Sequence, residues 1–100
     1  MVSMYNRNSK FEWDDAKRVI NLEKHGVDFV DAEKMWQGTM VVAEDTRLDY
    51  GESRYVGIGR IEGRVMVVVY TERVPDIVRI ISLRKANSRE VRSYEDATSK

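Results

Sequence analysis

Residues 63–86, GRVMVVVYTERVPDIVRIISLRKA, contain two runs of apolar, mostly β-branched residues on either side of a polar loop. Such runs, here 65–70 and 77–83, are typical of neighbouring strands, and the loop between them holds the only proline of the chain. We therefore expect a hairpin in the middle of a sheet. Arg79 interrupts the second run. A buried strand does not need a guanidinium, so a face or rim of the sheet should meet solvent or a polyanion.

Two further strands precede this hairpin. Residues 40–43 and 54–61 are apolar runs of strand length, and Glu62-Gly63 is a two-residue turn of the kind that closes tight hairpins. Pairing Ile61 with Arg64 sets the register of the strands on either side of that turn. The register of the last strand stays open, because a slip of one residue exchanges the two faces.

This register predicts what lies on each face of the sheet. Tyr55 lies opposite Tyr70, and Gly57 and Gly59 leave a shallow trough on the same face, where a helix or a ligand can approach closely. The opposite face carries branched aliphatic residues: Val56, Ile58, Val65, Val67 and Val69.

Helical signals occupy the first third of the chain. Asp14 is a plausible N-cap and Gly26 a C-terminal stop for a first helix. Its apolar stripe at helical spacing consists of Ala16, Val19, Ile20 and Leu22. A second helix is expected from Asp28 to Trp36 or Gln37, which makes Lys24-His25 the corner of a helix pair.

The two ends of the chain complete the predicted architecture. We expect residues 1–10 to form a mobile tail and 11–13 a short apolar segment compatible with an edge strand. Asn87 or Ser88 caps a terminal helix that ends near Asp96. The prediction is a single α+β domain over residues 11–100, with two N-terminal helices, a four-stranded, mostly antiparallel sheet and a C-terminal helix.

Composition narrows the possible functions. The chain has no cysteine and one histidine, which excludes disulfides, thiolate metal sites and a cysteine nucleophile; we expect neither a metal nor a cofactor. No apolar run reaches the ~20 residues that span a bilayer, so we expect no membrane association and a cytoplasmic location. Residues 1–50 hold 7 Lys+Arg and 10 Asp+Glu, a balance of −3, and residues 51–100 hold 10 and 7, a balance of +3. This asymmetry fits a positive surface for nucleic acid, or an ordinary fluctuation.

The available chemistry is cationic and aromatic. Arginine forks grip phosphate oxygens, tyrosines stack on unpaired bases, and a Lys/His pair can move protons near neutral pH. Such groups can cleave RNA without a metal, when the 2′-hydroxyl attacks the adjacent phosphorus and cations stabilise the charge that develops. We expect them to converge on one shallow pocket beside the helical corner.

Each candidate also has a structural explanation. His25 and Lys24 can simply complement the end of the first helix, and arginines such as Arg60 can protect a sheet edge. Arg79 can form a structural ion pair with an acid such as Glu44, Asp45 or Glu72. Tyr55 and Tyr70 can form an ordinary cross-strand pair.

Several blocks of the chain resemble the BrnT toxin family. They cover nearly all of residues 11–94 and are FEWD at 11–14, NLEKHGVDF at 21–29, ESRYVGIG at 52–59, YTER at 70–73 and RIISLRKA at 79–86. Two places depart from the family pattern: Val74-Pro75 stands where a tighter, glycine-containing turn is expected, and residues 35–38 where an aromatic is usually followed by Asp-Pro.

The resemblance implies a ribonuclease toxin of a type II toxin–antitoxin module, with a fold similar to the RelE and ParE toxins. It implies a BrnA-type antitoxin with a ribbon-helix-helix part as partner, a 2:2 complex, and contact with operator DNA only through the antitoxin. By position it implies Lys24, His25, Arg73 and Arg79 as catalytic residues. Arg54, Arg60, Tyr70 and Arg84 are the implied RNA contacts.

Other classes of function stay open at this stage. A non-catalytic module that binds nucleic acid or a partner would never cut RNA, and a degenerate toxin would only support repression. A gyrase poison of the ParE type would damage DNA and leave RNA intact. The resemblance favours the endoribonuclease, and the arginines and the Lys/His pair are residue types that can bind phosphate and transfer protons.

Overall fold

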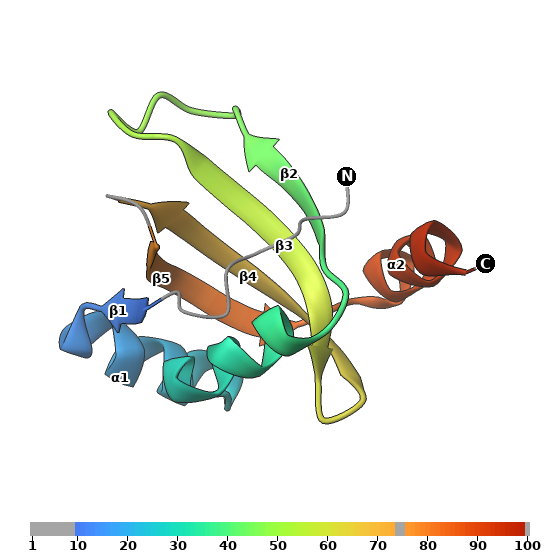
Figure 1. The fold of residues 1–100 in the computed structure, drawn as a ribbon. Helices are drawn as coiled ribbons and strands as arrows, with labels where there is room; N and C mark the ends of the chain where they lie inside the picture. The colour runs from blue at the N-terminus through green and yellow to red at the C-terminus, as the bar shows by residue number, and fades with distance from the viewer. Residues whose placement is uncertain (1–9, 74–75, 100) are drawn as a thin grey trace.

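The computed structural model describes residues 10–73 and 76–99, and it contains a five-stranded sheet with three helices (Figure 1). The elements in chain order are β1 Lys10–Trp13, α1 Asp15–His25, the 3₁₀ helix η1 Phe29–Gln37, β2 Val41–Asp45, β3 Arg54–Ile61, β4 Arg64–Glu72, β5 Ile77–Lys85 and α2 Ser88–Thr98. The strand order is β1-β5-β4-β3-β2. The predicted α+β class is therefore confirmed, with one strand more than expected.

The predicted register of the β3–β4 hairpin is confirmed. Ile61 pairs with Arg64 and Tyr55 with Tyr70, and all pairs between them follow. The turn residues Glu62 and Gly63 have φ angles of 49° and 83°. Positive φ at both central positions is the signature of a type I′ turn, whose twist matches that of the strands it joins.

The glycine trough on β3 is filled by methionine side chains. A Cβ atom added at Gly57 would lie 2.5 Å from Cε of Met40, and one at Gly59 would lie 3.1 Å from Cγ of the same residue. Met35 of η1 also reaches Gly59, at 3.5 Å. The trough therefore receives the core and is not a ligand groove.

The core lies between this face of the sheet and η1, as the predicted second helix implied. Phe29, Ala32, Met35 and Trp36 project from η1 and are buried. Aromatic edge-to-face contacts join Trp36 to Tyr70 and to Phe11, with ring centroids 4.9 and 5.1 Å apart. Such contacts fix the orientation of η1 on the sheet.

The fifth strand is β1, which the predicted four-stranded sheet omitted. It pairs in parallel with β5, with Phe11 opposite Val78 and Trp13 opposite Ile80. Phe11 and Trp13 pack against the core, so Glu12 between them points to the other face. Lys10 belongs to this strand, so the predicted tail of residues 1–10 extends one residue too far; its residues 1–9 lie outside the described part.

The predicted inner face of α1 is wrong. Val19, Ile20 and Leu22 are 52%, 61% and 40% exposed, whereas Asn21 is buried. The Asn21 amide donates to the carbonyl of Leu83 at 2.8 Å and accepts from the N–H of Leu83 at 3.1 Å. Asn21 therefore makes the two hydrogen bonds to β5 that the backbone of a neighbouring strand would make. These hydrogen bonds orient the helix on the sheet.

A bulge in β5 decides the face on which Arg79 lies. Val69 pairs with Ser82, but the next residue, Tyr70, pairs with Ile80, so Ile81 is the extra residue. Strict alternation from the buried Leu83 would have turned Arg79 into the core. The extra residue reverses the alternation and places Arg79 on the face away from η1.

Helix α2 follows β5 and lies away from α1 and η1 (Figure 1). Asn87 caps it as predicted, within a capping box completed by Glu90. The hydroxyl of Tyr94 donates to the carbonyl of Thr39 at 2.9 Å and ties the helix to the segment before β2. No helix in the described residues has the length and apolarity that a membrane span requires.

Candidate nucleic-acid interface

A row of polar side chains crosses the sheet on the face away from η1. Arg79 of β5 lies between Glu12 of β1 and Thr71 of β4. Arg54 of β3 lies beside Thr71, one position beyond the Tyr55–Tyr70 pair, and Asp45 of β2 pairs with Arg54. Neighbouring strands lie about 4.8 Å apart, so Arg54 and Arg79 are separated by two such spacings, roughly 10 Å at the backbone.

Arg73, in the segment after β4, joins this row through ion pairs with two acids. Its guanidinium lies 3.8 Å from Glu12 and 3.7 Å from Glu52. Glu12 also accepts a 2.8 Å hydrogen bond from Arg79, and Glu52 lies 3.7 Å from Arg54. We call Arg54, Arg73 and Arg79 the arginine cluster, with Glu12 and Glu52 as the acids that link its members.

Arg54 is held on the ring of Tyr50. Its guanidinium carbon lies 4.0 Å above the ring centroid, and the hydroxyl of Tyr50 lies 3.2 Å from a carboxylate oxygen of Asp45. The buried Nε of Arg54 has no hydrogen-bond partner within the described residues. Stacking therefore orients this guanidinium and leaves it an unused donor.

The arginine cluster is accessible from solvent. The side chains of Arg54, Arg73 and Arg79 are 24%, 50% and 30% exposed. Three of their four ion pairs are 3.7 Å or longer, beyond good hydrogen-bond distance. The carboxylates occupy only some of the N–H donors of these guanidinium groups. An anion that reaches the other donors can form charge-assisted hydrogen bonds with them. A phosphate can present two oxygens to the planar fork of a guanidinium group, so it is a suitable anion for this site.

The predicted acid partners of Arg79 were not the ones found. Glu44, Asp45 and Glu72 were expected, and the partner is Glu12, a residue 67 positions away in the sequence. The parallel pairing of β1 with β5 brings the two side chains together. A sequence signal for Glu12 does exist: it is the charged residue between two aromatics in a segment of period two.

The Lys24-His25 corner does not join the arginine cluster, contrary to the expected convergence. Helix α1 begins after Trp13, which pairs with Ile80, and reaches Leu83 at Asn21. One turn later its last residues lie toward the opposite end of β5 from Arg79. In the described part of the chain, neither Lys24 nor His25 forms an ion pair with Glu12 or Glu52, the acids that link the cluster.

Arg60 and Arg84 also lie apart from the cluster. Arg84 donates two 2.8 Å hydrogen bonds to Glu90, which lowers the pKa of that carboxyl and raises the pKa of Arg84. Arg60 lies over the ring of Tyr94 at 5.4 Å and donates to the carbonyl of Gly63. Arg84 thus links β5 to α2, and Arg60 links β3 to the β3–β4 turn and to α2.

Tyr70 is buried in the core and has no free ring face for a base. It is 2% exposed and contacts the rings of both Trp36 and Tyr55. Burial is the main reason that the pKa of its phenol is raised, with smaller contributions from Glu72 and Tyr55. The cross-strand pairing with Tyr55 is confirmed; an RNA contact through this ring does not fit its burial.

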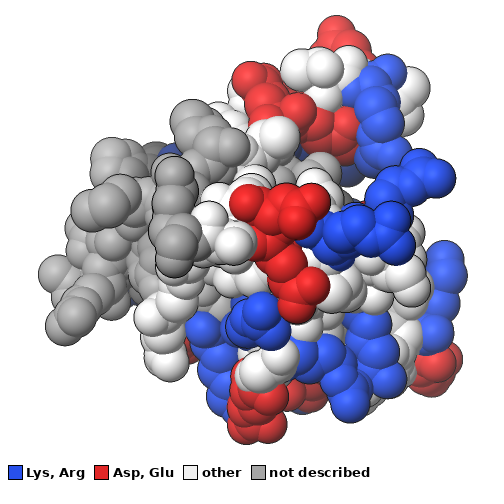
Figure 2. Space-filling model, turned by 90° about the vertical axis from the view of Figure 1, so that its right-hand side faces the viewer, with Lys and Arg blue, Asp and Glu red and all other residues white. Residues whose placement is uncertain are grey.

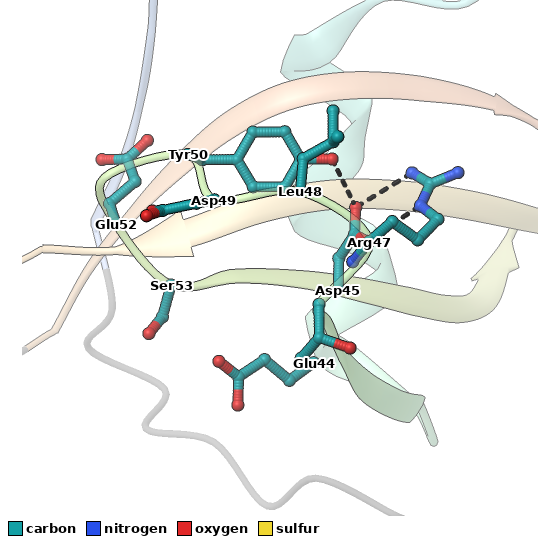
Figure 3. A pocket seen from close by; sticks show the side chains of 9 residues that line it. Glu44, Asp45, Arg47, Leu48, Asp49, Tyr50, Glu52 and Ser53 are labelled. Atoms are coloured by element: carbon teal, nitrogen blue, oxygen red, sulfur yellow. Dashed lines mark hydrogen bonds and ion pairs between the residues drawn. The ribbon is translucent and has the colours of Figure 1, made fainter.

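A hollow of about 480 Å³ adjoins the cluster in the β2–β3 loop (Figure 3). Four of its nine lining residues are acidic, namely Glu44, Asp45, Asp49 and Glu52, and one, Arg47, is basic. Arg47 donates two 2.9 Å hydrogen bonds to the buried Asp45, and this contact is the main reason that the pKa of Asp45 is lowered. Carboxylates repel phosphate, so we place the RNA-binding candidate at the arginines and not in this hollow.

Charge on the side that bears α2 is mixed. Figure 2 shows Lys and Arg interspersed with Asp and Glu there, so the basic second half of the sequence does not give this side a single sign. Among the described residues, no three His, Asp or Glu side chains are grouped as a metal site would need.

Comparison with known proteins identifies the class. The family model described as "Ribonuclease toxin, BrnT, of type II toxin-antitoxin system" matches residues 13–90. The chain is thus a member of a class of ribonuclease toxins from type II toxin–antitoxin systems. More particularly, it belongs to the BrnT family.

A solved structure agrees with this assignment. The crystal structure of the Brucella abortus ribonuclease toxin BrnT is similar over 80% of this chain and 99% of its own, with 30% sequence identity and a TM-score of 0.64. A comparison with curated protein sequences found no match.

Proposed function

We propose that this chain is an endoribonuclease that cleaves RNA without a metal ion, and that it inhibits translation in the cytoplasm. The observation that carries the proposal is the arginine cluster, in which Arg54, Arg73 and Arg79 come from separate segments to one end of one sheet face. Membership in a family of ribonuclease toxins makes RNA the expected ligand of these guanidinium groups.

The three arginines would act as a clamp on the scissile phosphate. Two of them, Arg73 and Arg79, lie on the same carboxylate and so have guanidinium groups close enough to share one phosphate. They would stabilise the additional charge on the pentacoordinate phosphorus when the 2′-hydroxyl attacks. Arg54, on its tyrosine, would hold the neighbouring backbone phosphate.

The proposal includes a protein partner. A type II toxin family implies a protein antitoxin, and we propose a BrnA-type antitoxin with a ribbon-helix-helix part, in a 2:2 complex that contacts operator DNA through the antitoxin. Co-expression with such an antitoxin should restore growth, and the complex should elute at the mass of two chains of each kind.

The experiment incubates the purified chain with labelled RNA in EDTA, with and without ribosomes, and maps the cut ends. We expect cleavage with a 2′,3′-cyclic phosphate, and a loss of about 100-fold in Arg73→Ala and Arg79→Ala. Arg92→Ala is the matched control, because Arg92 is an exposed arginine on α2. A requirement for magnesium would contradict the mechanism.

Other outcomes would identify a different activity. If the wild type binds RNA and never cuts it, and the alanine variants differ only in affinity and salt dependence, the chain is a non-catalytic binding module. If expression arrests growth while RNA stays intact and DNA is damaged, the activity is that of a gyrase poison.

A further inference from the structure

We propose that Glu12 is the general base of the cleavage reaction, whereas the family resemblance implied Lys24 or His25 as the carriers of protons. This inference rests on the proposed ribonuclease function and deepens it. Lys24 and His25 lie toward the other end of β5, so a different group must take the proton of the 2′-hydroxyl. The acids within the arginine cluster are the groups in reach.

One of the two carboxylate oxygens of Glu12, Oε2, accepts the hydrogen bond that holds Arg79. Oε2 accepts the 2.8 Å hydrogen bond from Nη1 of Arg79 and lies 3.8 Å from Nε of Arg73. Within the described residues, Oε1 accepts no hydrogen bond. The side chain is 39% exposed, so a ribose can reach the free oxygen while the arginines hold the adjacent phosphate.

Glu52, the other acid of the cluster, lies between a different pair of arginines. Its Oε1 lies 3.7 Å from Arg73 and its Oε2 lies 3.7 Å from Arg54. Glu52 therefore bridges Arg73 and Arg54, whereas Glu12 lies beside Arg73 and Arg79, the two arginines proposed to hold the scissile phosphate. A base must lie next to that phosphate, so Glu52 is better placed to position arginines than to accept the proton. The geometry thus separates the two acids into a base, Glu12, and a positioning residue, Glu52.

The reaction step balances with water as the only additional reactant. Oε1 of Glu12 takes the proton of the 2′-hydroxyl, and the 2′-oxygen forms a bond to phosphorus as the bond from phosphorus to the 5′-oxygen breaks. The 5′-oxygen takes a proton from water. The hydroxide that remains is neutralised by the proton that Glu12 then releases, so the carboxylate is ready for the next cycle.

The test compares Glu12→Gln with the wild type in single-turnover cleavage of labelled RNA over a range of pH. Glutamine keeps the length of the side chain and an oxygen for the arginines but cannot take up the proton. We expect cleavage to fall about 100-fold or more, RNA affinity to change less than about threefold, and the acidic limb of the pH–rate profile to disappear. Glu12→Asp should restore part of the rate together with the acidic limb.

Two control variants separate the base from its surroundings. The charged groups that face Glu12 are Arg79 on β5 and Arg73 after β4, with Glu52 beyond Arg73. Glu52→Gln should weaken RNA binding and retain the acidic limb. Glu44→Gln, an exposed carboxylate on β2, should leave cleavage unchanged.

The outcomes distinguish this inference from the proposed function. If the wild type cleaves RNA and Glu12→Gln cleaves within tenfold of it with the same pH profile, the assignment of the base is wrong and the ribonuclease function stands. If Glu12→Gln loses only affinity, Glu12 is a positioning residue and the assignment is again wrong. If the wild type does not cleave RNA, both proposals fail. The unfolding midpoint of each variant, measured by circular dichroism, identifies those that do not fold.

Discussion

The side-chain amide of Asn21 hydrogen-bonds both backbone groups of Leu83, with distances of 2.8 Å to the carbonyl and 3.1 Å from the N–H. β1 ends at Trp13, opposite Ile80, so beyond that pair no strand among residues 10–73 and 76–99 lies beside this edge of β5. One asparagine therefore satisfies the two polar groups of Leu83 that β1 does not reach.

Asn21→Ala should lower the free energy of unfolding by about 2–3 kcal/mol, because it leaves the buried N–H and carbonyl of Leu83 without partners. Urea unfolding followed by circular dichroism measures the loss. Glu23→Ala, at an exposed position of the same helix, is the control. Equal midpoints for the two variants would show that Asn21 does not contribute as described.

The exposed apolar side chains of α1 give a second prediction. Ile20 is 61% exposed, so Ile20→Glu should change the free energy of unfolding by less than about 0.5 kcal/mol. Met35 is fully buried beneath the sheet, and Met35→Ala should cost about 2–5 kcal/mol. A large loss in Ile20→Glu would instead support the helix orientation that the sequence pattern predicted.

The ion pair between Arg18 and Asp28 predicts a dependence of stability on pH. Hydrogen bonds from Arg18, at 2.7 and 2.9 Å, are the main cause of the lowered pKa of Asp28. Because the folded-state pKa is depressed, this stabilisation is complete above the unfolded value of about 4 and is lost as the pH falls through the folded value.

Asp28→Asn tests this effect, since asparagine keeps the N-cap of η1 and removes the charge. The variant should be less stable than the wild type at pH 7, and the two should converge as the pH falls below about 4. Thermal unfolding across pH 2–8 measures it. Glu23→Gln is the control, and a constant difference between Asp28→Asn and the wild type would refute the linkage.

Arg79→Lys tests whether the planar guanidinium matters beyond its charge. Lysine lacks the planar fork that directs two parallel N–H donors at one phosphate, so we expect cleavage to fall by about tenfold to a hundredfold although the net charge is unchanged. Single-turnover cleavage is the measurement, with Arg92→Lys on α2 as the control. Full activity in Arg79→Lys would mean that a point charge is sufficient at this position.

Local features of the fold followed from the sequence. The Glu62-Gly63 turn fixed the register of β3 and β4, because a two-residue loop leaves the strands a single way to pair. The N-cap at Asp14, the left-handed Gly26 and the capping box at Asn87 were also recognisable, since each depends on a few adjacent residues.

Long-range features did not follow from the sequence. The parallel pairing of β1 depends on a strand 67 residues away, and the bulge at Ile81 depends on how β5 meets β4. Periodicity placed the apolar residues of α1 inward, but the hydrogen bonds of Asn21 to Leu83 determine its orientation. The candidate site was therefore found in part: three of its arginines were predicted, and the acids between them were not.

The order in which the chain is synthesised has a consequence for when this face can form. The polar row needs β1, near the start of the chain, beside β5, near its end. A ribosome must therefore release most of the polypeptide before Glu12 can meet Arg79. Until β5 has been synthesised, Glu12 lacks the strand that carries Arg79, so the arginine cluster cannot form on the growing chain.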